Sequence, residues 1–154
     1  MQQIYSMYFP TFNPQSKVWI YAANRVLTES EQKFISNEMK TFTKSWAAHG
    51  SGLKADGILE YNQFVILSVD ESDINASGCS IDSSVKFIKE IGEELSVDFF
   101  DRLNLVIEKD GKFNRSHISE LKNFSDWNVF NPMITDLIGL RTDWKQSVTK
   151  SPFF

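Results

Sequence analysis

The sequence predicts an α+β fold with the ferredoxin-like order β-α-β-β-α-β, and three stretches lead to this prediction. Residues 18–23 have the composition of a strand, residues 28–31 have the spacing of a helix start, and residues 75–84 join a hydrophobic strand to a second helix. Right-handed crossovers would place both helices on one face of an antiparallel sheet. In that sheet we expect the first and third strands to lie parallel and adjacent.

The amino-terminal third is expected to contain an arm, a strand and a helix. Residues 1–17 include two prolines and are expected to form an extended arm. Residues 18–23 are rich in the β-branched and aromatic side chains that favour strands. The next signal is a capping box, in which Thr28 is the N-cap and Glu31 reaches back to it. Apolar residues three and four positions apart then extend a helix toward Gly50, namely Ile35, Met39, Phe42 and Trp46.

The middle of the chain is expected to contain a hairpin followed by the second helix. Residues 58–61 and 64–69 have the composition of two short strands, with a tight turn at Asn62-Gln63 between them. The segment Ser77–Ser80 then begins a helix that ends near Leu95. Its apolar stripe consists of Ile81, Val85, Ile88, Ile91 and Leu95.

The carboxyl-terminal third is expected to complete the sheet and then to cover it. Residues 103–108 form the predicted fourth strand, and Lys109-Asp-Gly-Lys112 has the composition of a hairpin turn. Residues 113–116 would then add an extra hairpin strand, followed by a brief third helix near Leu121. Residues 125–154 are aromatic and broken by polar residues, so we expect them to wrap over the bare face of the sheet. The whole chain, 1–154, is expected to form a single α+β domain.

Composition excludes several classes of protein. The 154 residues carry a net charge of −4 and a pI near 5.2, which argues against nucleic-acid binding by clustered cations. No apolar run is long enough to span a membrane, and the first residues lack the pattern of a signal peptide. A single cysteine permits no internal disulfide. We therefore expect a cytoplasmic protein that is a monomer or a weak homodimer.

The predicted topology brings several polar segments to one rim of the sheet. The carboxyl ends of the first and third strands, the starts of both helices and the start of the fourth strand would meet there. Gly78 and its neighbouring serines leave free backbone N–H groups at a helix start, which suits an anion or a cap. The predicted ligand-binding residues are Asn24, Arg25, Asp70, Ser77, Gly78, Cys79, Ser80, Asp101 and Arg102.

Two hypotheses of function follow from this rim. The first is a non-catalytic binding or interaction domain that takes a small anionic ligand or a protein partner beside Arg25, Gly78 and Arg102. The structural alternative is that the arginines pair with Asp70 and Asp101 and only fix loops, and that the serines only cap a helix.

The second hypothesis is a thiol-dependent enzyme or redox sensor that uses Cys79, the candidate catalytic residue, at a helix start. Such a thiol needs a base, and the sequence offers only His49 and His117. No motif predicts a metal ion or an organic cofactor, because the phosphate loop, the dinucleotide-binding glycine pattern and paired metal-binding histidines are all missing.

Several motifs resemble a family of small bacterial proteins found mainly in Bacteroidetes and often labelled "ABC transporter ATPase". The resemblance runs from about Pro10 to Asn131. This chain differs where members have glutamine in place of Ala22, and its last residues, 151–154, lack a Trp-His pair. The resemblance implies a lineage and no mechanism, because the label's ATPase activity would need a phosphate loop and the chain has none. The motifs that carry it are Val18-Trp-Ile-Tyr21, Asn24-Arg25, Trp46-Ala-Ala-His-Gly50, the strand pair around Tyr61 and Phe64, Gly78-Cys-Ser-Ile-Asp82 and Ser84-Val-Lys-Phe-Ile88.

Overall fold

The computed structural model describes residues 8–48 and 50–154, and it confirms a mixed α+β fold. The predicted base His49 and residues 1–7 of the predicted arm lie outside the described residues. The helices are α2 (Glu29–Ser45), α3 (Gly78–Leu95) and α4 (Leu137–Thr142), with 3-10 turns at Ile118–Phe124 and Val148–Lys150. The strands are β1 (Lys17–Ala22), β2 (Ala47–Ala48), β3 (Ser51–Gly52), β4 (Lys54–Glu60), β5 (Phe64–Asp70), β6 (Asn104–Lys109), β7 (Lys112–His117), β8 (Asn128–Phe130) and β9 (Lys145–Ser147).

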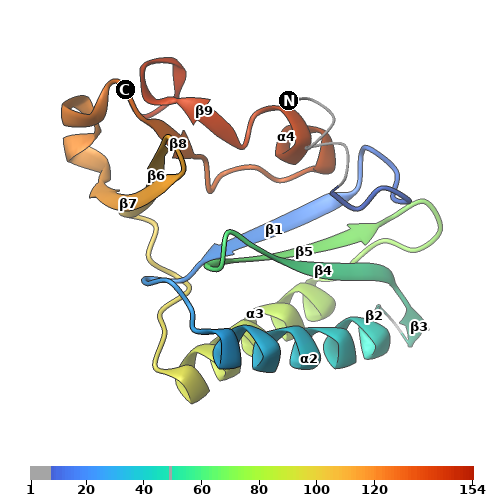
Figure 1. Ribbon diagram of the computed structural model, residues 1–154. Helices are drawn as coiled ribbons and strands as arrows, with labels where there is room; N and C mark the ends of the chain where they lie inside the picture. Colours follow the sequence, from blue (N-terminus) through green and yellow to red (C-terminus); the bar gives the residue numbers. More distant parts are fainter. Residues whose placement is uncertain (1–7, 49) are drawn as a thin grey trace.

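The elements form layers on the two faces of a central sheet with the strand order β1-β5-β4. Helices α2 and α3 cover one face, and the carboxyl-terminal part of the chain covers the other (Figure 1). That part contains a second sheet, of order β7-β6-β8-β9, together with α4. No helix within residues 8–48 and 50–154 is long and apolar enough to cross a membrane.

The direction of β1 differs from the prediction. Lys17 pairs with Val69 and Ala22 with Phe64, so β1 and β5 run antiparallel rather than parallel. The physical reason is the tight hairpin between β4 and β5. The crossover through α2 leaves β4 parallel to β1, and the hairpin then reverses the chain and inserts β5 between them. The carboxyl ends of β1 and β5 therefore lie at opposite ends of the sheet.

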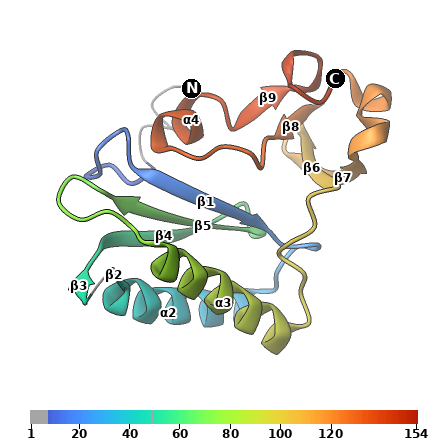
Figure 2. The ribbon, with the colours of Figure 1, turned by 180° about the vertical axis from the view of Figure 1, so that it is seen from behind.

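The predicted fourth strand also lies elsewhere. It is observed as β6, which pairs with β7 and β8 and not with β1. Residues 96–103 carry the chain from the end of α3 to the second sheet (Figure 2). The complete ferredoxin-like arrangement is therefore not confirmed, and β1 is an edge strand of the central sheet.

The local signals located both long-helix starts and one of the two hairpin turns. Thr28 and Glu31 form the predicted capping box, and Asp110-Gly111 forms the predicted turn with φ values of 52° and 81°. The other hairpin turns one residue earlier than predicted, because Tyr61 and Asn62 adopt the positive φ values of 51° and 59°.

Both faces of the central sheet are buried. On the helix side, Tyr21, Leu67 and Val69 of the sheet pack with Ile35 of α2 and Ile88 of α3. On the other side, sheet residues pack with aromatic and aliphatic residues of the carboxyl-terminal segment, namely Val18, Ile20, Phe64 and Ile66 with Phe130, Leu137, Leu140 and Trp144. The predicted cover of the bare sheet face by residues 125–154 is therefore present.

Candidate functional site

The predicted rim is divided between two ends of the central sheet. Asn24 and Arg25 follow the carboxyl end of β1, whereas Asp70 and Ser77–Ser80 follow the carboxyl end of β5. Since the two strands are antiparallel, these groups cannot form one site.

Arg25 is held by a structural ion pair. Its guanidinium donates to both carboxylate oxygens of Glu31, at 2.8 and 2.7 Å, and to the Leu95 carbonyl oxygen at 3.1 Å. Hydrogen bonds from Arg25, followed by the bond from the Thr28 N–H, lower the pKa of Glu31 to about 2. Nearby, the side-chain oxygen of Asn24 accepts a hydrogen bond from the Asp98 N–H. Arg25 thus pairs with neither of the aspartates that the sequence suggested, and it joins the start of α2 to the end of α3.

Asp70 is also occupied by bonds within the protein. Its carboxylate accepts hydrogen bonds from the Ser72 hydroxyl and N–H and from the Asn13 N–H, and it lies 3.3 Å from the Lys54 ammonium. These contacts, led by the Ser72 hydroxyl, hold the pKa of Asp70 well below its usual range. Asp70 lines a separate polar cavity of about 230 Å³ with Glu71.

The serine-rich junction forms a helix cap. The Ser77 hydroxyl accepts from the Ser80 N–H at 3.1 Å, and the Ser80 hydroxyl accepts from the Ser77 N–H at 2.6 Å. The junction therefore has the structural role that the sequence allowed as an alternative. Gly78 and Cys79 occupy the first positions of α3, and both are exposed. Within the described chain no hydrogen bond involves the Cys79 sulfur.

His117 belongs to another part of the molecule. It lies at the end of β7, where its Nδ1 accepts from the Ser119 N–H at 3.2 Å. The pKa of Asp101 is lowered mainly by hydrogen bonds from the Asn104 side chain and the Leu103 N–H, and least by the electrostatic influence of His117. Asp101 thus shapes the turn before β6.

Arg102 is the one predicted ligand-binding residue that lines the large pocket beside β1. Its Nη1 donates to the Pro132 carbonyl oxygen at 2.8 Å. No carboxylate of the described residues lies within 4.0 Å of its guanidinium. By contrast, Arg115 and Arg141 are held by two and three hydrogen bonds inside the protein. Arg102 therefore keeps most of its donors available.

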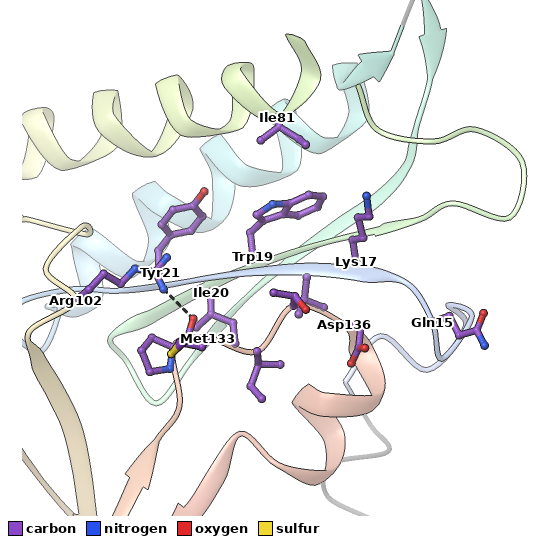
Figure 3. Close-up of a pocket in the computed structure, with 13 residues that line it drawn as sticks. Gln15, Lys17, Trp19, Ile20, Tyr21, Ile81, Arg102, Met133 and Asp136 are labelled. Atoms are coloured by element: carbon purple, nitrogen blue, oxygen red, sulfur yellow. Dashed lines mark hydrogen bonds between the residues drawn. The ribbon is translucent and has the colours of Figure 1, made fainter. Parts of the chain in front are cut away.

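The pocket beside β1, called here the β1-edge pocket, has a volume of about 700 Å³. Residues 17–21 of β1 form its floor, Ile81 of α3 lies on one side, and residues 132–136 lie on the other (Figure 3). Arg102 lies at the end near Tyr21, and Lys17 and Gln15 lie toward the opposite end. A concave site of this volume, with aromatic and aliphatic walls and a few polar groups, is typical of sites for small organic or peptide ligands.

The β1-edge pocket is lined by three charged side chains, and Arg102 differs from Lys17 and Asp136 because it has no ion-pair or helix-capping partner among the described residues. Lys17 is 3.5 Å from Glu71, which offsets part of its charge, and the Asp136 carboxylate accepts from the Gly139 N–H at the start of α4. Burial raises the pKa of the Tyr21 hydroxyl, although a hydrogen bond with Ser84 and the charge of Arg102 oppose this rise. Tyr21 therefore stays neutral at pH 7, and the pocket presents a cation beside aromatic rings.

A second groove has the opposite charge. It lies between α2 and α3, has a volume of about 350 Å³, and is lined by three glutamates and three apolar residues: Glu38, Glu90, Glu94, Phe34, Phe87 and Ile91. An anionic ligand is therefore favoured at the β1-edge pocket and disfavoured here. Within residues 8–48 and 50–154, no group of three His, Cys, Asp or Glu side chains is placed to hold a metal ion.

Sequence reasoning missed most of the pocket. Trp19, Ile81, Met133 and Asp136 were not predicted as site residues, and the first three supply its apolar walls. The sequence contained one signal, the short apolar segment Pro132-Met-Ile134 in the carboxyl-terminal part of the chain. In the structure Met133 of this segment is 67% exposed. Comparison of the chain with protein-family models, with curated proteins and with solved structures found no match.

Proposed function

We propose that this chain is a cytoplasmic, non-catalytic binding domain, and that an anionic group of its ligand binds Arg102 in the β1-edge pocket. The single observation that carries the proposal is the state of Arg102. It lines a pocket of about 700 Å³ and has no carboxylate partner among the described residues. A guanidinium with free donors is well suited to a carboxylate or a phosphate, because it offers paired N–H groups in one plane.

The walls support recognition of an amphipathic ligand. Trp19 is half-buried and Ile81 lies across from it, so the body of a ligand would contact apolar surface while its charged group contacts Arg102. The Met133 side chain is exposed at the rim and flexible, which suits it to close over a ligand. These features favour binding over chemistry.

The two rival functions have weaker support. The thiol hypothesis requires a base beside Cys79, and His117 lies at the end of β7, beside Asp101. ATP hydrolysis would need a phosphate-binding loop, and the sequence contains no such motif. Neither residue pattern connects with the β1-edge pocket, so we do not propose either activity.

Thermal unfolding in the presence of candidate ligands tests the proposal. The panel should contain aromatic carboxylates, nucleotides, phosphorylated metabolites and a pool of short acidic peptides. A ligand at 100 times its Kd is expected to stabilise the native state by about 2.7 kcal/mol. The shift should disappear in Arg102→Gln and persist in Arg25→Gln, a matched variant whose arginine lies outside the pocket.

Two results would contradict the proposal. One is a panel in which no compound raises the melting temperature of the wild-type protein. The other is a shift of equal size in the wild-type protein and in Arg102→Gln, because binding would then occur elsewhere.

A further inference from the structure

We propose that the occupant of the β1-edge pocket is an extended acidic peptide segment that pairs with β1 as an added strand. This inference rests on the proposed function, since it names the ligand of the same pocket. Strand addition uses backbone groups of an exposed sheet edge for affinity and neighbouring side chains for specificity. The structure supplies both beside β1.

The topology leaves a vacant strand position next to β1. The strands β1, β4 and β5 and the helices α2 and α3 follow the order β-α-β-β-α, and a further strand after α3 would complete a split β-α-β sheet at this edge. That strand, β6, pairs instead with β7 and β8 in the second sheet. Among the described residues, the outer edge of β1 therefore has no full-length neighbour.

The backbone of β1 shows which groups face the vacant position. The Val18 N–H donates outward to the Thr135 carbonyl oxygen at 3.0 Å, and the Ser16 carbonyl oxygen accepts from the Leu137 N–H at 2.9 Å. Because the direction of backbone groups alternates along a strand, the N–H and C=O groups of Ile20 and Ala22 also point outward. No backbone partner for these groups appears within residues 8–48 and 50–154.

The protein's own chain begins to fill this position and then leaves it. Residues 135–137 run antiparallel to β1, with one bridge between Lys17 and Asp136. Pro132 has no N–H to donate, and its carbonyl oxygen accepts from Arg102. The Asn131 N–H donates to the Trp144 carbonyl oxygen at 2.7 Å, and this bond fixes Asn131 beside the second sheet. The pocket is the gap that results between β1 and residues 132–134.

The gap determines the occupant. The added strand would lie in line with residues 135–137 and, like them, would run antiparallel to β1. It would enter the gap at the end beside Arg102. Side chains of that strand on the face of Trp19 and Tyr21 would meet apolar walls, which include Ile81. An acidic side chain early in the segment would reach the unpaired charge of Arg102. The favoured occupant is an extended segment in which an acidic residue precedes an apolar one.

A selection experiment tests this inference. A phage-displayed library of short linear peptides is selected against the full-length protein, and the selected peptides are synthesised for fluorescence anisotropy. We expect an enriched Asp or Glu before an apolar residue. Loss of the charge-assisted bonds in Arg102→Gln should weaken binding at least about tenfold, whereas Arg25→Gln should leave the affinity unchanged.

Backbone methylation distinguishes strand addition from other modes of peptide binding. Methylating the peptide N–H groups one at a time should weaken binding at alternate positions only, by about fivefold for each lost backbone bond. This probe leaves the protein unaltered. In parallel, Ala22→Pro should weaken binding because it removes an outward N–H, and Ala22→Ser should not.

The outcomes separate this inference from the proposed function. If methylation has no alternating effect, or if small anions bind through Arg102 while no peptide does, the peptide-strand inference is wrong and the anion site remains. If peptides bind equally to the wild-type protein and Arg102→Gln, and no small anion depends on Arg102, both proposals are wrong.

Discussion

The Arg102 guanidinium donates to the Pro132 carbonyl oxygen at 2.8 Å, and this bond links the turn before β6 to the segment that precedes α4. The two residues are 30 positions apart in the sequence. Residues 132–134 line the β1-edge pocket opposite β1, and the other donors of Arg102 have no carboxylate partner among the described residues. The binding account depends on this arrangement.

The first prediction separates the role of Arg102 in binding from a role in stability. Arg102→Gln should change the free energy of unfolding by no more than about 0.5 kcal/mol, because the side chain is exposed and makes a single hydrogen bond with the described part of the chain. Urea unfolding measures this value. A loss of several kcal/mol would mean that Arg102 is a structural residue.

Acid unfolding tests the ion pair between Arg25 and Glu31. The pKa of Glu31 in the folded protein is lowered to about 2, whereas an unperturbed glutamate has a pKa of about 4.3. The unfolded chain therefore binds this proton first, so the stabilisation is complete above about pH 4.3 and is lost as the pH falls toward 2. Glu31→Gln and Arg25→Gln should both weaken the pH dependence of stability across this range. An unchanged slope in both variants would show that the pair contributes nothing.

The cover of the central sheet can be tested at Trp144. This side chain is 1% exposed and packs against Phe64 with ring centroids 4.8 Å apart. Trp144→Ala should destabilise the protein by about 3–5 kcal/mol. Trp144→Phe should cost clearly less, because it keeps much of the ring and removes an indole N–H that has no partner among the described residues. Equal losses for the two variants would contradict packing as the cause.

Cys79 provides a test of the rival thiol hypothesis. The residue is exposed, so iodoacetamide should alkylate it in the native protein. Neither alkylation nor Cys79→Ser should alter ligand binding, because Cys79 does not line the β1-edge pocket. Binding or turnover that is lost in Cys79→Ser would favour the thiol enzyme.

Features set by neighbouring residues could be predicted from the sequence. Thr28 and Glu31 are three positions apart, and Asp-Gly is a preferred pair for the positive φ values of two-residue hairpin turns, as observed at Asp110-Gly111. The apolar content of residues 125–154 predicted that they cover the sheet, since so much apolar surface must be buried.

Features set by distant pairing could not be predicted in this way. The direction of β1 depends on its register with β5, and the displacement of β6 depends on β8, a three-residue strand without a clear pattern. Because β1 and β5 were expected to be parallel, the prediction placed Arg25 and Asp70 at the same rim of the sheet. Arg102 contacts Pro132, 30 positions away in the sequence, and no local pattern reveals that contact.

Amide hydrogen exchange along β1, measured by NMR, tests the central claim most directly. The account predicts alternation in the free protein: the Trp19 and Tyr21 amides, which face β5, are protected, while the Ile20 and Ala22 amides exchange faster. Adding a selected peptide should protect Ile20 and Ala22 in the wild-type protein and not in Arg102→Gln. Uniform protection of all four amides in the free protein, or no change at Ile20 and Ala22 when a peptide binds, would contradict an open edge that receives the ligand.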